Sequence, residues 1–125
     1  MRRNPDHERF LIKNLEAVDR MAEIADLIDK TYKDLLSMEN ELTPLLKKNM
    51  IDGLTTKIQA FGEESTNVSN DFQQEHDVIR WGDFRKLRNI MAHNYEFVDD
   101  DIIISACENM LNIRDTLDEI INQYK

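Results

Sequence analysis

The chain has 125 residues, of which 41% are hydrophobic and 33% are charged, and its formal net charge at pH 7 is −9. This length predicts one domain spanning residues 1–125, and the composition excludes collagen-like, low-complexity and membrane-spanning classes. The negative net charge argues against indiscriminate binding to nucleic acid, because that affinity comes mainly from neutralising phosphates.

Few residues in the chain break helices. It holds three glycines and two prolines, and its commonest residues favour long helices, so we expect an all-α fold. The polar start of the chain lacks the pattern of a signal peptide, and no apolar run reaches the ~18 residues that span a bilayer, so we expect a cytoplasmic protein. The single cysteine, Cys107, has apolar neighbours and is expected to pack in the core.

The first half of the chain predicts two long helices. Asn4 followed by Pro5 is typical of a helix start, and apolar residues recur at intervals of three and four to about Met38. Thr43-Pro44 repeats the start signal, and a second stripe follows: Leu46, Met50, Leu54, Ile58, Phe61 and further to Ser65 and Val68. The polar, unpatterned residues 69–76 predict a loop or a frayed helical end.

The second half predicts a short helix and a third long one. The short helix runs roughly from Asp83 to His93, with Trp81 packing just ahead of it. Aspartates 99–101 offer an acidic start for the last helix, whose apolar stripe runs to Ile120. Three long helices and one short helix predict a four-helix, up-and-down type bundle. The consecutive isoleucines 102–104 indicate that self-association covers part of the last helix.

The segment from Arg80 to Tyr95 concentrates the residue types that carry chemistry. The segment has a net charge of +3, which leaves −12 for the rest of the chain. This charge comes from four basic residues and one aspartate: Arg80, Arg85, Lys86, Arg88 and Asp83. A purely structural interpretation is open, in which the charges are solvated, His93 ends a helix and Tyr95 packs on the core.

Helical spacing constrains how these side chains meet. Asn89 and His93 are four residues apart and share a face, so the Asn89 side chain can orient the imidazole. Arg88 and His93 are about 140° apart around a helix, so their side chains diverge. They converge if the helix ends before His93, or if two copies of the segment meet across a dimer axis.

The order Arg88-Asn89, three residues, His93, one residue, Tyr95 resembles the R-x4-H-x-Y signature of the HEPN superfamily, in particular of HepT-like toxins. The sequence Trp-Gly-Asp-Phe at 81–84 resembles the entry to that family's motif helix, and residues 58–64 resemble the Gly-Glu segment of its second helix. The likeness covers residues 58–121. The family usually has proline ahead of the tryptophan, where this chain has Arg80, so the local turn differs.

The resemblance implies a HEPN-like bundle that acts as a homodimeric ribonuclease toxin of a type II- or VII-like toxin–antitoxin pair. Its motif residues would line a cleft at the dimer interface and cut RNA without a metal. The partner would be a minimal nucleotidyltransferase antitoxin that transfers AMP to the motif tyrosine, here Tyr95.

The residues themselves also favour chemistry without a metal or other cofactor. The three histidines are scattered, Cys107 stands alone, and none falls at a zinc-ligand spacing. We therefore expect His93 to transfer protons in an attack by the RNA 2′-OH, and Arg88 to grip the phosphate. Asn89 would support His93, and Arg85 and Lys86 would bind RNA.

Two other classes of function stay open. In the first, the bundle is a non-catalytic interaction subunit that binds a minimal nucleotidyltransferase, which suits the acidic body of the chain. In the second, it is an inert helical ligand-binding domain. Growth arrest that is lost with Arg88→Ala or His93→Ala would separate the enzyme from the interaction subunit.

Overall fold

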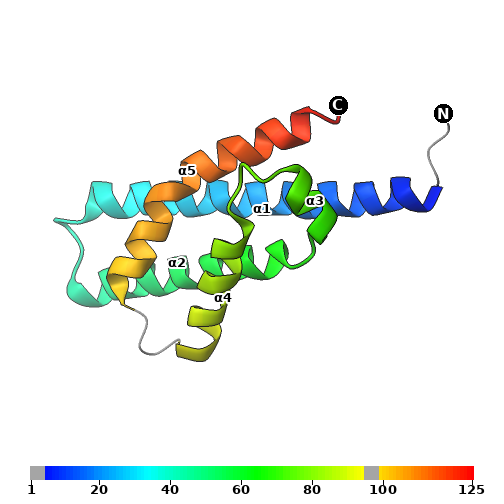
Figure 1. The fold of residues 1–125 in the computed structure, drawn as a ribbon. Helices are drawn as coiled ribbons and strands as arrows, with labels where there is room; N and C mark the ends of the chain where they lie inside the picture. The colour runs from blue at the N-terminus through cyan, green and yellow to red at the C-terminus, as the bar shows by residue number, and fades with distance from the viewer. Residues whose placement is uncertain (1–4, 95–98) are drawn as a thin grey trace.

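The computed structural model describes residues 5–94 and 99–125, and these residues form five helices and no strand. The helices are α1 (Pro5–Met38), α2 (Pro44–Ser65), α3 (Asn70–Glu75), α4 (Trp81–Asn94) and α5 (Asp100–Asn122). Figure 1 shows α1 and α2 running antiparallel; α5 packs against both, and α4 packs against α2. The predicted all-α bundle is confirmed.

The helices begin where the capping signals place them. The Thr43 hydroxyl accepts a hydrogen bond from the backbone N–H of Leu46 at 3.2 Å, and Pro44 is the first residue of α2. The Asp99 carboxylate accepts one from the N–H of Asp101 at 3.0 Å and caps α5. The aspartate run therefore starts a helix, as expected. Asn4 lies outside the described residues.

The core is built from the predicted stripes, with two corrections. Phe61 is fully buried, and its ring meets that of Phe84 edge-on at a centroid distance of 4.8 Å. Ile103 is also buried, so the bundle itself covers it and self-association is not needed there; Ile102 is 40% exposed. The expectation that Leu46 joins the stripe is wrong, because the first turn of α2 lies beside the end of α1, at the edge of the bundle, and leaves it 51% exposed. None of the described helices combines the length and apolar character needed to cross a membrane.

The segment 69–76, predicted as a loop or a frayed helical end, instead contains a separate six-residue helix, α3. The Ser69 hydroxyl caps it by accepting from the N–H of Phe72 at 3.2 Å. Asn14 of α1 holds that cap twice, since its amide donates to the Ser69 hydroxyl at 3.1 Å and its carbonyl accepts from the Ser69 N–H at 2.8 Å. Phe72 is buried. Tertiary contacts thus hold a helix that is too short to show a periodic pattern.

A cluster of rings fixes the start of α4. The indole N–H of Trp81 donates to the backbone carbonyl of His76 at 3.0 Å, and the His76 Nε2 is hydrogen-bonded to the Tyr124 hydroxyl at 2.6 Å. Trp81 and His76 are both buried. The segment between α3 and α4 is therefore tied to the C-terminal end of the chain, and α4 begins at Trp81, two residues earlier than predicted.

Candidate functional site

The motif helix runs without a break past both residues of the predicted catalytic pair. α4 extends from Trp81 to Asn94 and includes positions 88 and 93. The possibility that the helix ends before His93 is therefore wrong. Five residues along a regular helix turn the backbone by about 140°, so positions 88 and 93 lie on different sides of α4. Of the two arrangements that would bring these side chains together, only the meeting of two copies of α4 across a dimer axis is left.

Positions 88 and 93 bound one strip along α4. Going around the helix from Arg88, Ala92, Arg85 and Asn89 come next, about 40°, 60° and 100° away, before position 93 is reached. Ala92, Arg85 and Asn89 are all exposed. We call residues 85, 88, 89, 92 and 93 the outer face of α4. The His93 side chain and the whole of Tyr95 lie outside the described part of the structure, and so does any contact of Asn89 with that imidazole.

Arg88 is held at the edge of α2. Its Nε donates to the Glu63 carboxylate at 2.7 Å, and the two side chains are 37% and 50% exposed. Gly62, which precedes Glu63, is buried, and a Cβ built on it would stand 2.8 Å from the Arg88 Cβ. The Gly-Glu pair resembles the second helix of HepT-like toxins in sequence, but its spacing from Arg88 does not predict that Glu63 contacts Arg88.

The positive charge of the segment is partly neutralised. Arg80 forms an ion pair with Asp83 at 3.2 Å, and Arg88 forms one with Glu63. Arg85 and Lys86 are exposed, and neither is paired with another residue that the structure describes. Within the described part of this segment, the exposed cations that have no carboxylate partner are thus Arg85 and Lys86, the two predicted to bind RNA.

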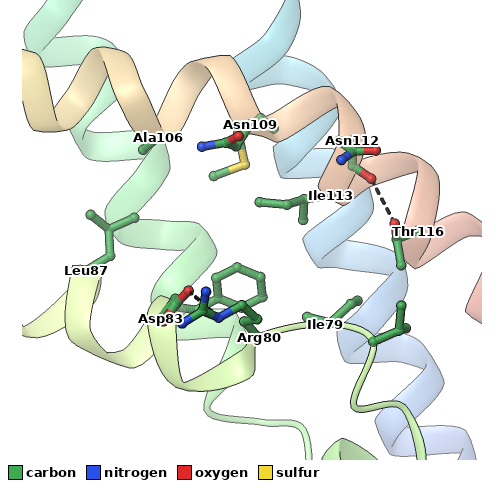
Figure 2. Close-up of a pocket in the computed structure, with 12 residues that line it drawn as sticks. Ile79, Arg80, Asp83, Leu87, Ala106, Asn109, Asn112, Ile113 and Thr116 are labelled. Carbon is green, nitrogen blue, oxygen red and sulfur yellow. Dashed lines mark hydrogen bonds and ion pairs between the residues drawn. The ribbon is translucent and has the colours of Figure 1, made fainter.

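A groove lies on the opposite side of α4, against α5. Figure 2 shows Asp83 and Leu87 of α4 facing Ala106, Asn109 and Ile113 of α5 across it. It has a volume of about 410 Å³, and a neighbouring hollow of about 480 Å³ is bordered by the exposed Ile90 and Ile102. Arg88 lines neither, but Lys86, which is predicted to bind RNA, borders the neighbouring hollow.

The remaining titratable groups do not converge on α4. Among the residues whose side chains the structure describes, no three histidine, cysteine, aspartate or glutamate side chains are grouped so that they could hold a metal ion. Cys107 is buried, as expected, and burial raises the pKa of its thiol to about 12. It is a core residue rather than a nucleophile.

Comparison with protein families matches residues 14–123 to the family described as "Ribonuclease HepT-like". The matched range contains α2, α4 and α5, and therefore both Glu63 and the whole motif helix. No curated protein and no solved structure gave a significant match to the chain.

Proposed function

Because the chain belongs to the HepT-like ribonuclease family, we propose that it is a cytoplasmic ribonuclease toxin of a toxin–antitoxin pair. In this proposal it works as a homodimer and cuts RNA internally without a metal. Family membership supports the activity, and the geometry of α4 supports the dimer.

The continuity of α4 through position 93 is the observation that carries the proposal. A single chain sends Arg88 toward α2 and turns position 93 about 140° away from it. Packing the outer faces of two copies across a two-fold axis would place Arg88 of one copy near position 93 of the other. Ala92 lies between these edges, and its small side chain would let the two helices approach closely.

The chemistry follows from what transesterification needs. One His93 imidazole would take the proton from the 2′-OH, whose oxygen then attacks phosphorus. The His93 of the second copy would protonate the departing 5′ oxygen. Arg88 would bind the developing phosphorane charge with its planar fork of donors. The products are a 2′,3′-cyclic phosphate and a free 5′-OH.

Substrate binding would rest on a small basic surface. Arg85 and Lys86 are exposed on α4 and have no carboxylate partner among the described residues. Their phosphate contacts would orient the RNA, whereas the acidic remainder of the chain repels RNA elsewhere. Asn89 is proposed to orient the His93 ring from one turn earlier in the same helix.

The proposed partner is a minimal nucleotidyltransferase antitoxin. By position in the motif, Tyr95 is the residue that would receive AMP. Adding phosphate groups beside the cleft would block it by bulk and by negative charge.

A cleavage assay on single-stranded RNA in excess EDTA tests the proposal. The parent should release cyclic-phosphate ends, and Arg88→Ala and His93→Ala should each lower kcat about a hundredfold or more. Ala92→Glu, in the middle of the outer face, should give a monomer on size-exclusion chromatography and no cleavage. Arg20→Ala is the matched control: it also removes an arginine from an ion pair, here with Glu64 of α2, but it lies on α1.

Cleavage by His93→Ala at the parental rate would overturn the catalytic assignment. Loss of the parent's activity in EDTA, with recovery on adding a divalent cation, would overturn the metal-free mechanism. An active Ala92→Glu monomer would exclude the composite site.

A second function, the non-catalytic interaction subunit, is favoured by two observations. The chain is strongly acidic, and the Nε of Arg88 already donates to a carboxylate of the same chain. In that case expression should not arrest growth, or the arrest should persist in both Arg88→Ala and His93→Ala.

A further inference from the structure

Where α2 and α4 touch, the backbone of α2 packs against the Cα and Cβ atoms of Arg88. A Cβ on Gly62 would lie 2.8 Å from the Arg88 Cβ and 3.2 Å from the carbonyl oxygen of Phe84, both closer than ordinary packing allows. The absence of a side chain at Gly62 is therefore what lets α4 approach so closely. From this point the Arg88 side chain reaches the next residue of α2, Glu63.

The ion pair between Arg88 and Glu63 uses the inner nitrogen of the guanidinium. The Nε–H donates to the Glu63 Oε1 at 2.7 Å. A guanidinium has five N–H donors in a rigid plane, so this bond orients the plane and leaves the four donors of the two terminal nitrogens for another acceptor. Glu64, the next residue, turns away and pairs with Arg20 of α1 at 2.6 Å.

We propose that Glu63 is a positioning residue for Arg88: its carboxylate holds the Nε so that the terminal nitrogens point to the scissile phosphate. This inference rests on the proposed ribonuclease function. A long arginine side chain that is already held in one rotamer loses less freedom when the phosphate arrives. The close packing at Gly62 fixes the position of the Arg88 Cβ, and Glu63 fixes the orientation of the guanidinium. The side chain is therefore constrained at both ends.

The opposite role, in which Glu63 competes with the phosphate for Arg88, makes a different prediction. If Glu63 competes with the phosphate, removing its side chain should raise kcat. If Glu63 positions Arg88, removing its side chain should lower kcat, and a neutral residue that still accepts from the Arg88 Nε should restore it. Glutamine has an amide oxygen in the same place and lacks the charge, so it separates the two roles.

The experiment compares Glu63→Ala, Glu63→Gln and the adjacent control Glu64→Ala on a single-stranded RNA oligonucleotide, with kcat and KM determined separately. Glu63→Ala should lower kcat about tenfold, as expected when a reacting group is misplaced by a fraction of an ångström to an ångström. Glu63→Gln should recover kcat to within about threefold of the parent. Glu64→Ala should change kcat by less than about twofold, because its side chain contacts Arg20 of α1 and Asn67 rather than α4. Circular dichroism checks that each variant folds.

A double variant tests whether the effect passes through Arg88. In the Arg88→Ala background, Glu63→Ala should cause no further loss, because its target is gone. A role confined to stability would not produce rescue by glutamine or dependence on Arg88.

The inference is overturned if Glu63→Ala keeps or exceeds the parental kcat while Arg88→Ala is inactive; the proposed function then still stands. It is also overturned if Glu63→Gln has a kcat as low as that of Glu63→Ala, or if Glu64→Ala lowers kcat as much as Glu63→Ala does. Full activity of Arg88→Ala would instead refute the proposed function, and the positioning role with it.

Discussion

Replacing Gly62 with alanine should destabilise the fold, whereas the same replacement at Gly53 should stabilise it. Both glycines lie in α2, and neither has a positive φ, so alanine can adopt either backbone. A Cβ at Gly53 meets nothing within 4 Å. At Gly62 it meets the Arg88 Cβ at 2.8 Å and the Phe84 carbonyl oxygen at 3.2 Å. The two sites therefore differ mainly in steric contact.

The magnitude follows from two opposing effects. Alanine in place of a helical glycine contributes roughly 0.5–1 kcal/mol, because glycine loses more backbone freedom on folding. At Gly62 the new methyl meets atoms that are part of, or attached directly to, the backbone of α4, so relief requires the helix to shift. Overpacking of this kind costs roughly 1–3 kcal/mol. Gly62→Ala should therefore be less stable than Gly53→Ala by about 1–3 kcal/mol.

Urea denaturation followed by circular dichroism measures the difference directly, and thermal unfolding supports it. For a chain of this size each kcal/mol shifts Tm by about 4 °C, so the two variants should melt about 4–12 °C apart. Gly62→Ala should also lower ribonuclease activity, because it moves Arg88. Equal stabilisation by both alanines would refute the close approach of α2 and α4 at Gly62.

Two further predictions concern side chains away from Arg88. Burial raises the pKa of the Cys107 thiol to about 12 from an ordinary 9.0, so the folded protein should react slowly with a thiol reagent at pH 8 and rapidly in urea. Because the folded thiol keeps its proton to a higher pH than the unfolded thiol, the stability present below pH 9 is lost progressively as the pH rises from 9 through 12. Rapid labelling of the native protein at pH 8 would contradict the burial of Cys107. Coexpression with a minimal nucleotidyltransferase should add AMP to Tyr95, as seen by peptide mass spectrometry, and Tyr95→Phe should abolish the addition; AMP found only on another residue would reject the assignment.

The start and type of the long helices were predictable because they depend on neighbouring residues. Capping by Thr43 and Asp99 acts over two or three residues, and both caps form as predicted. The apolar stripe of α2 runs through Ile58 and Phe61, which are both buried. The stripe fails at Leu46, because periodicity identifies a face of a helix but not how far along it the neighbouring helices reach.

The sequence singles out a set of candidate residues but does not determine how they are arranged. The motif order identified Arg88, and the basic segment identified Arg85 and Lys86, which are exposed as expected. The pairing of Arg88 with Glu63 was not predictable, because it joins residues 25 positions apart. Whether α4 ends before position 93 also could not be read from the pattern, and this point decides whether one chain can complete the site.

Local spacing in the sequence alone therefore determined that the chain is helical, where its long helices begin and which segment carries the motif, since each of these depends on residues within one or two turns. Tertiary structure decided the rest. The turn of α3 exists because Asn14 holds its cap, α2 and α4 touch because Gly62 has no side chain, and Arg88 is oriented because Glu63 lies beside it. Each of these contacts joins segments that are distant in the chain, and only packing brings them together.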